Sequence, residues 1–360
     1  MNRLLVFIQF CILSLHIGLS AQETDPYTLP DFPIRKGVSA PFAGMADGRL
    51  IVAGGCNFPD TPAAEGGRKA FYDEIYAIEL THDSATWSLL STLPEPIAYG
   101  ATVTTSKGIV CIGGQNAQGP QTSVWQLDAD GHLTHLPSLP APVDNGGAAL
   151  IGHTVYVTGG NQPDGKKALY ALNLDNPTAW KRLADYPGLQ RIQPIVLSSD
   201  NRLFLIGGYS FDAASKTCIP STDMLSYDPS TDTWSNLDAI VPEKDGTLRC
   251  LAGGSGICKE GRLYLTGGVN LTIFRQAMEG KAPADYMRKS PDWYRFNDDL
   301  LIYDLQAGNW SIYPDMPGLA RAGGILLEYQ DRLYMICGEI KPGIRTPQIT
   351  VIPGKGWKNP

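Results

Sequence analysis

The stretch RLIVAGG at residues 49–55 decides the fold, because it is a short apolar run that ends in a glycine pair and it recurs along the chain. The later copies are GIVCIGG at 108–114, TVYVTGG at 154–160, RLFLIGG at 202–208 and RLYLTGG at 262–268. A sixth copy, RLYMICGE at 332–339, keeps Gly338 but has Cys337 in place of the first glycine. Successive doublets are 59, 46, 48, 60 and 70 residues apart. The chain therefore consists of six repeats, each of roughly fifty residues.

Each repeat continues with a loop, a second apolar run, a turn and usually a tryptophan. The second runs are 74–80, 168–174, 224–227 and 300–305, and the tryptophans are Trp87, Trp180, Trp234 and Trp310. In the second repeat Leu133 lies near the tryptophan position. Runs of this length that are rich in valine, isoleucine, leucine and tyrosine are typical of strands. Six such units resemble the kelch β-propeller, so we expect an all-β ring of six four-stranded blades, packed together by the glycines and tryptophans.

The sequences at the two ends of the chain predict how this ring closes. Residues 27–33 have the form of the end of a repeat without its beginning, and the last repeat runs through 348–352 to Trp357. We therefore expect the N-terminal segment to complete or flank the sixth blade, close to the C-terminus. Closure of this kind removes an exposed sheet edge. Residues 22–360 would then form a single propeller domain.

The first 21 residues predict a secretory signal peptide. Arg3 precedes an interrupted apolar run at 4–19, and small residues follow at 20–21, which is the pattern of a cleaved leader. The alternative is an uncleaved anchor, but the run is short and broken for a transmembrane helix of about 20 residues. We therefore expect a periplasmic or secreted protein with no membrane contact after cleavage.

Composition excludes some partners. Glycine accounts for 39 and proline for 27 of the 360 residues, above the usual shares of about 7 and 5 per cent. The excess glycine predicts many tight turns, and a hydrophobic share of 43 % is enough for a large core. The net charge of −7 provides no basic footprint for nucleic acid, so we expect no nucleic-acid partner.

The cysteines and histidines predict neither a disulfide framework nor a metal centre. Six cysteines remain without the leader, and five lie in or beside predicted strands: Cys56, Cys111, Cys250, Cys258 and Cys337. A free cysteine packs as a small hydrophobe, so we expect mostly buried thiols, although export also permits a disulfide. The remaining histidines lack a metal-ligand neighbourhood, so we expect no metal; they are His82, His132, His135 and His153.

The sixth repeat departs most from the pattern. Glu339 directly follows Gly338, and Lys341 and Arg345 lie close behind it, separated by proline and glycine that hold a fixed loop. An acid and a guanidinium at this spacing can act on one anionic ligand. The alternative is a surface salt bridge or a loop hydrogen bond.

The motif GEIKPGIRT at 338–346 resembles the GEAKPGLRT-type signature of bacterial N-acetylneuraminate epimerases, the sialic acid mutarotases. Residues 267–270 and 186–193 also resemble that family. One difference is large, because the family's glutamate motif lies in the middle of the chain, whereas here it lies near the C-terminus. Residues 34–140 resemble the family's last two blades, which indicates a cyclic permutation by two blades. A closed ring of repeats tolerates such an exchange.

This resemblance implies that the chain interconverts the α and β anomers of N-acetylneuraminate by opening and closing the sugar ring. Glu339 would accept a proton in general acid/base catalysis. Arg345 would bind the substrate carboxylate, as arginine does bidentately, or stabilise developing charge. The chemistry requires no metal or other cofactor.

The repeat also marks weaker candidates for substrate binding. Arg191 and Arg321 each lie sixteen residues before the first doublet position of their repeat, where a side chain can face the central funnel or instead bond to a neighbouring blade. Tyr99 lies at a comparable strand start, and Asn270 follows a doublet. The insertion 274–297 is a candidate lid or subunit contact, so a homo-oligomer is left open.

Three other functions compete with the isomerase. A non-catalytic kelch propeller would bind a glycan or a protein without turnover. A copper oxidase would need tyrosine, cysteine and histidine ligands, and the histidine distribution does not favour it. A sialidase would show repeated Asp boxes, and the sequence has none.

Overall fold

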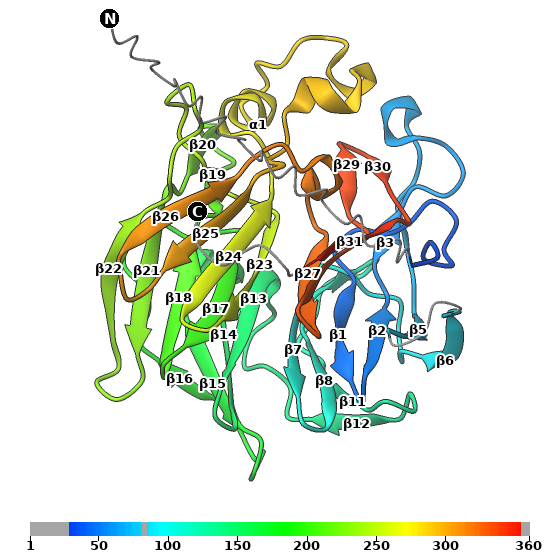
Figure 1. The fold of residues 1–360 in the computed structure, drawn as a ribbon, viewed down its shortest axis with the longest axis vertical. Coiled ribbons are helices and arrows are strands. Elements are labelled where there is room, and N and C mark those ends of the chain that lie inside the picture. The colour runs from blue at the N-terminus through cyan, green and yellow to red at the C-terminus, as the bar shows by residue number, and fades with distance from the viewer. Residues whose placement is uncertain (1–28, 81–84, 354–360) are drawn as a thin grey trace, which may run out of the picture.

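The computed structural model of the chain describes residues 29–80 and 85–353, so the predicted leader and Trp357 lie outside the described residues. The sheets follow one another from blue to red along the chain (Figure 1). The first strand of each sheet contacts the first strand of the next, and β27 (Ile325–Tyr329) contacts β1 (Phe42–Ala46). The sheets therefore form a closed ring, and the predicted six-bladed all-β propeller is confirmed.

Five blades contain four antiparallel strands in sequence order from the centre outward. They are β1 (Phe42–Ala46), β2 (Arg49–Ala53), β5 (Glu74–Glu79) and β6 (Ser88–Thr92); β7 (Ala101–Thr105), β8 (Gly108–Ile112), β11 (Val124–Leu127) and β12 (Leu133–Leu136); β13 (Asp144–Ile151), β14 (Thr154–Asn161), β15 (Leu169–Asn173) and β16 (Lys181–Leu183); β17 (Ile195–Ser199), β18 (Arg202–Ile206), β21 (Asp223–Asp228) and β22 (Thr233–Ala239); β23 (Gly254–Lys259), β24 (Arg262–Gly267), β25 (Leu300–Asp304) and β26 (Asn309–Tyr313). In the described residues the sixth blade has three strands: β27, β28 (Arg332–Ile336) and β31 (Ile349–Pro353).

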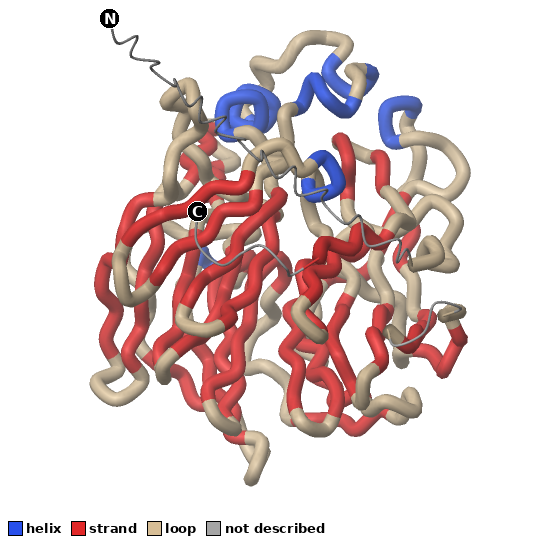
Figure 2. The backbone as a smooth tube through the Cα atoms, in the orientation of Figure 1, coloured by secondary structure: helices blue, strands red, loops and turns tan. Residues whose placement is uncertain are grey.

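Short hairpins and helical segments extend from one end of the ring. The hairpins are β3 (Cys56–Asn57) with β4 (Ala70–Phe71), β9 (Gln115–Asn116) with β10 (Gly119–Pro120), β19 (Tyr209–Asp212) with β20 (Thr217–Pro220), and β29 (Glu339–Lys341) with β30 (Ile344–Arg345). The helices are α1 (Leu271–Met278) and the 3₁₀ turns η1 (Ala63–Glu65), η2 (Pro163–Gly165), η3 (Tyr286–Arg288), η4 (Pro291–Tyr294) and η5 (Pro317–Leu319). Figure 2 shows most helical segments gathered at the end where the β29–β30 hairpin lies.

The core lies between blades rather than within them. Six clusters of buried apolar side chains each join two consecutive blades, including the last and the first. In β2, Leu50 and Val52 pack toward the sixth blade, whereas Ile51 and Ala53 pack toward the second. Successive side chains of a strand point to opposite faces. The runs before the doublets are therefore apolar throughout, because both of their faces are covered.

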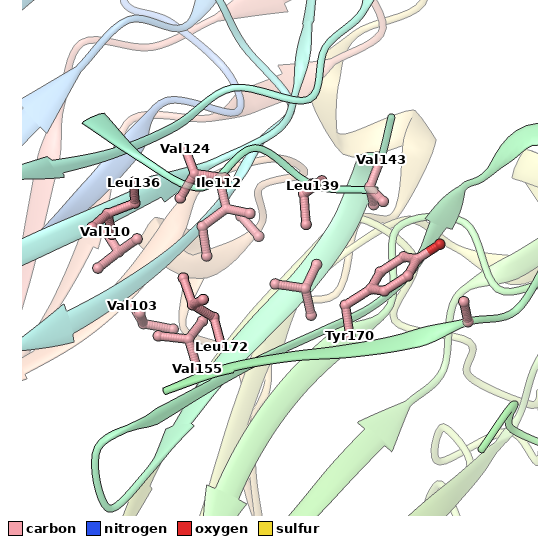
Figure 3. Close-up of a cluster of buried hydrophobic side chains, with 13 residues drawn as sticks. Val103, Val110, Ile112, Val124, Leu136, Leu139, Val143, Val155, Tyr170 and Leu172 are labelled. Carbon is pink, nitrogen blue, oxygen red and sulfur yellow. The ribbon is translucent and has the colours of Figure 1, made fainter. Parts of the chain in front are cut away.

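Figure 3 shows one of these interfaces, between the second and third blades. Val110 and Ile112 on β8 face Val155 on β14 and Leu172 on β15. These four side chains are at most 1 % exposed. Burial of each such side chain contributes about 1.5–3 kcal/mol relative to exposure, so the blade interfaces are the main source of stability.

Tryptophans tie four of the blades to the segment that precedes each of them. Trp180, Trp234 and Trp310 donate their indole N–H to Pro137, Ala184 and Ala239 at 2.7, 2.9 and 3.2 Å. Trp87 of the first blade donates at 3.0 Å to Pro30. The N-terminal segment thus supplies the acceptor that the end of a blade supplies elsewhere. Phe32 also donates its N–H to the Pro347 carbonyl at 2.8 Å and packs with Ile336, so the prediction that this segment flanks the sixth blade is confirmed.

The glycine doublets are explained by the approach of the next blade. Gly207 has a φ of 58°, and a Cβ there would lie 2.0 Å from the carbonyl oxygen of Cys250. Cys337, at the matching position of the sixth blade, keeps a φ of 50° and is fully buried.

The six cysteines of the described residues are all free and five are buried, which confirms the prediction of mostly buried thiols. No helix in 29–80 or 85–353 has the length and apolar character needed to cross a membrane.

A ring of backbone hydrogen bonds joins the six blades where the central channel opens toward the hairpins. In each blade one residue at the start of the innermost strand, or one or two residues before it, donates its N–H to the carbonyl of its counterpart in the preceding blade, at 2.6–3.1 Å: Ala40, Tyr99, Asn145, Gln193, Gly253 and Gly323. All six have φ between 51° and 72°. The cycle closes because Ala40 donates to Gly323. This left-handed backbone, rare for residues other than glycine, fixes the floor on which the site is built.

Candidate active site

A cavity of about 520 Å³ lies above the ring of backbone hydrogen bonds. All six ring residues line it, and so do side chains from the hairpins and from the insertion 274–297. Its charged lining residues are Lys69, Glu339 and Arg345. The cavity therefore combines a rigid floor with one acidic and two basic side chains.

The β29–β30 hairpin explains why the spacing of Glu339 and Arg345 matters. A tight turn makes the two residues direct partners across the hairpin, so a separation of six residues becomes a side-by-side pair. Arg345 Nη1 lies 3.0 Å from Glu339 Oε1. Nη1 has no well-aligned hydrogen bond, so the contact is an ion pair. The same carboxylate oxygen accepts the backbone N–H of Gly343 at 2.6 Å.

Arg345 is held on every side. Its Nε donates to Ser39 Oγ at 3.1 Å, and its guanidinium lies 5.0 Å from the centre of the Phe58 ring. Its side chain is 4 % exposed. A guanidinium stacked on an aromatic ring and paired with a carboxylate is pre-organised, so Arg345 is placed to hold Glu339 in one orientation.

The carboxyl of Glu339 has a pKa above its ordinary value. Burial raises the pKa, because it penalises the charged form. Arg345, the Gly343 N–H and Lys69 lower it, but to a smaller extent. A carboxylate whose pKa is raised accepts a proton more readily than an ordinary carboxylate, which suits it to the role of a general base.

Tyr99 and Lys69 form a second polar pair in the cavity. The Lys69 ammonium donates to Tyr99 Oη at 2.8 Å and lies 4.8 Å from the centre of its ring. The Cys56 thiol donates to the same oxygen at 3.2 Å. Burial, with a smaller effect of Cys56, raises the pKa of Tyr99 above its ordinary range, so the phenol stays protonated.

Asn270 and Lys341 have their polar atoms engaged by the protein. Asn270 lines the cavity, but its side chain caps α1 by accepting the Ile273 N–H at 3.1 Å and donates to Glu243 at 3.3 Å. Lys341 does not line the cavity, and its Nζ donates at 2.6 Å to the Lys289 carbonyl in the insertion. Lys341 thus ties the β29–β30 hairpin to the insertion.

Arg191 and Arg321 lie outside the cavity lining. Arg191 binds both carboxylate oxygens of Asp223 at 2.9 and 3.0 Å, within the fourth blade. Arg321 donates to Thr350 and to the carbonyls of Met335, Cys337 and Gln348, within the sixth blade. Their predicted orientation toward the funnel is therefore wrong, and the bonds stay inside one blade rather than crossing to a neighbour. A substrate contact by either arginine stays a prediction that this geometry does not support.

The insertion forms the roof of the cavity. Helix α1 contributes Ile273, Phe274, Ala277 and Met278, and the turns η3 and η4 with the residues beside them contribute Tyr286, Met287, Tyr294 and Phe296. The ring centres of Phe274 and Tyr209 of β19 lie 4.8 Å apart. The aromatics also pack on one another, because Tyr294 and Phe296 form their own cluster with Ala322. The insertion is thus positioned as a lid whose aromatic side chains also stabilise it.

Several cavity residues were not predicted from the sequence. Tyr209 directly follows the doublet of its repeat, as Glu339 follows Gly338, so the repeat could have indicated it. Gln193 precedes an innermost strand in the same register as Tyr99. Lys69 and Phe58 lie in an irregular loop of the first blade, where no repeat position marks them.

Among residues 29–80 and 85–353, one group at the surface outside this cavity has side chains of the kind that bind metal ions. Asp128, Asp130 and His132 have ligand atoms within 4.8 Å of one another. Asp128 already accepts the backbone N–H groups of Asp130 and His132, both at 2.9 Å, as in an ordinary turn. An acidic turn with its oxygens engaged in this way does not by itself indicate a metal site.

The family model of N-acetylneuraminate epimerase matches residues 20–135 and 136–356. The chain belongs to the N-acetylneuraminate epimerase family. The boundary between the two matches, at residues 135 and 136, falls at the end of β12 (Leu133–Leu136), the last strand of the second blade. The two matches thus divide the chain at the end of the second blade, which is the point where the predicted cyclic permutation would divide it.

Individual epimerases match over part of their length. The chain is 33 % identical over 240 residues to the N-acetylneuraminate epimerase of Haemophilus influenzae (strain PittEE), covering 62 % of this chain and 61 % of the relative. For the Pasteurella multocida (strain Pm70) enzyme the identity is 30 % over 223 residues, with coverages of 59 % and 57 %. The matched region thus spans about three fifths of these curated relatives.

The fold has a solved counterpart. The structure of YjhT superposes with a TM-score of 0.65 at 16 % identity, covering 92 % of this chain and 98 % of that one. At this identity the likeness concerns the fold alone, and it agrees with a propeller that occupies almost the whole described chain.

Proposed function

We propose that the protein is a mutarotase that interconverts the α and β anomers of N-acetylneuraminate. The observation that carries the proposal is the Glu339–Arg345 pair, which faces a cavity of about 520 Å³ with its two side chains 3.0 Å apart. Membership of the epimerase family and the names of the relatives support this substrate.

In the proposed reaction Glu339 takes the proton of the anomeric hydroxyl. The anomeric carbon–oxygen bond of the hydroxyl becomes a carbonyl, the bond to the ring oxygen breaks, and its electron pair passes to that oxygen. The ring oxygen takes up one proton, which the protonated Glu339 carboxyl is available to deliver. Rotation about the bond beside the carbonyl and closure by the reverse steps give the other anomer.

The geometry favours one of the two roles that the resemblance gives Arg345. A guanidinium that is 4 % exposed and already paired with Glu339 is poorly placed to form a new bidentate contact with a substrate. We therefore assign it to orienting Glu339 and balancing its charge. A positioned base of this kind typically contributes 10²- to 10⁴-fold to the rate.

The Glu339→Gln variant tests the proposal. Glutamine keeps the acceptor for the Gly343 N–H but cannot take a proton, so we expect anomer exchange to fall by roughly 10²- to 10⁴-fold. The measurement is an NMR time course of freshly released α-N-acetylneuraminate, with the uncatalysed rate subtracted. A folded variant with the wild-type rate would remove Glu339 from the mechanism. A wild-type protein that binds the sugar without accelerating exchange would instead be a non-catalytic glycan-binding propeller.

A further inference from the structure

The charges of the cavity leave one cation without an acidic partner. Among the described residues that line it, Glu339 and Arg345 neutralise each other as an ion pair. Lys69 forms no ion pair with a described carboxylate, and its polar contact is the Tyr99 hydroxyl. The cavity is thus complementary to a ligand with a single negative charge.

Lys69 is also the cation that is free to move toward a ligand. It is exposed, whereas the Arg345 side chain is 4 % exposed and is held by Glu339, Ser39 and Phe58. An ammonium has three donors, and Tyr99 Oη takes one of them at 2.8 Å. Two N–H donors therefore remain for an anion in the cavity.

Tyr99 gives this flexible side chain a defined place. Its backbone belongs to the ring of hydrogen bonds, where it donates to Ala40 and accepts from Asn145 at 2.9 and 2.7 Å. The Cys56 thiol donates to its hydroxyl oxygen at 3.2 Å. The phenol is therefore fixed on the rigid floor, and Lys69 is held against it by a hydrogen bond and by the face of the ring.

We infer that the ammonium of Lys69, positioned by Tyr99, binds the carboxylate of the sugar acid while Glu339 acts on its anomeric hydroxyl. The inference rests on the proposed function. In a 2-keto sugar acid the carboxylate is attached to the anomeric carbon, so an anchor on the carboxylate brings the reacting atoms beside Glu339. Both anomers carry this carboxylate, and one anchor therefore serves both directions of the reaction. Lys69 would select acidic keto sugars over neutral ones.

The test compares Lys69→Met and Lys69→Arg with the wild-type protein on N-acetylneuraminate and on its methyl ester, which lacks the negative charge. A hydrogen bond to a charged group accounts for about a ten- to hundredfold change in binding. We expect Lys69→Met to weaken binding of the acid by that factor, measured by titration calorimetry. It should leave binding of the ester unchanged, and Lys69→Arg should restore much of the preference for the acid.

Lys107→Met is the matched control, because Lys107 is exposed in the β7–β8 turn and does not line the cavity. It should bind both compounds as the wild type does. If Lys69→Met prefers the acid over the ester by the same affinity ratio as the wild type, Lys69 does not bind the carboxylate. This conclusion would hold even if the protein catalyses anomer exchange. If the acid-to-ester affinity ratio depends on Lys69 but the protein does not accelerate anomer exchange, Lys69 binds the carboxylate and the proposed mutarotase activity is rejected. Absence of binding for both compounds would overturn both ideas.

Discussion

At the scale of single residues, the raised pKa of Glu339 predicts the pH dependence of activity. The ionised carboxylate is the active base, so kcat/KM should rise with pH through a pKa above the ordinary glutamate value. Arg345 lowers that pKa. Arg345→Met should therefore move the acidic limb of the pH–rate profile to higher pH, in addition to reducing the rate. Arg345→Lys should move it back.

The profile is measured by NMR exchange rates after subtraction of the uncatalysed reaction at each pH. A limb that stays in place in Arg345→Met, or that moves to lower pH, would show that Arg345 does not set the charge of Glu339.

The sequence predicted this pair because a six-residue spacing survives as a direct hairpin contact. It did not predict Lys69, since its contact with Tyr99 depends on two different blades meeting in space.

The arginines show the limit of repeat spacing at this scale. Arg191 and Arg321 lie where the repeat places them, at the entrance to inner strands. Spacing fixes the position of the backbone but not the direction of a long side chain. Both guanidiniums turn into their own blades, because buried carbonyls and the Asp223 carboxylate satisfy them there.

At the scale of elements, the β29–β30 turn is predicted to position Glu339, so that distorting it lowers activity in addition to any loss of stability. Gly343 has a φ of 80°, and a Cβ there would lie 2.6 Å from the Cβ of Ala63 in η1. Gly343→Ala should displace the turn and with it the N–H that binds Glu339, so we expect kcat/KM to fall at least about tenfold, equivalent to a misplacement cost near 1.4 kcal/mol.

Gly165→Ala is the control for backbone strain alone. Gly165 also has a left-handed φ, 64°, but a Cβ there would have no atom within 4 Å. Both variants should lose about 1–2 kcal/mol of unfolding free energy from the left-handed backbone, measured by urea denaturation. Equal activity in the two variants would mean that the turn does not position Glu339.

At the scale of the whole molecule, the six blade interfaces were predictable and the contents of the cavity were only partly so. The repeats determine the number of blades and the apolar runs, because every blade interface buries side chains from both faces of its strands in the same way. The roof arises from one insertion, 274–297, that breaks the period. Its length and aromatic content were visible, but its placement over the central cavity depends on tertiary contacts such as that between Phe274 and Tyr209.

Closure of the ring leads to a prediction for the N-terminal segment. Phe32 is 2 % exposed and its ring lies 5.4 and 5.3 Å from those of Tyr76 and Trp87, in the cluster that joins the sixth blade to the first. Phe32→Ala should reduce the free energy of unfolding by about 3–5 kcal/mol, as expected for a buried phenylalanine. Hydrogen exchange should speed up in both β2 and β28, because this cluster spans the closure.

Phe204→Ala is the matched variant, since Phe204 is equally buried in the cluster between the fourth and fifth blades. It should lose similar stability, with faster exchange in β18 and β24 instead. If Phe32→Ala changes stability by less than about 1 kcal/mol, the N-terminal segment does not hold the ring closed. At this closure the hairpins of the sixth and first blades, which carry Glu339 and Lys69, lie beside one another. Looser packing there should therefore lower kcat/KM more in Phe32→Ala than in Phe204→Ala.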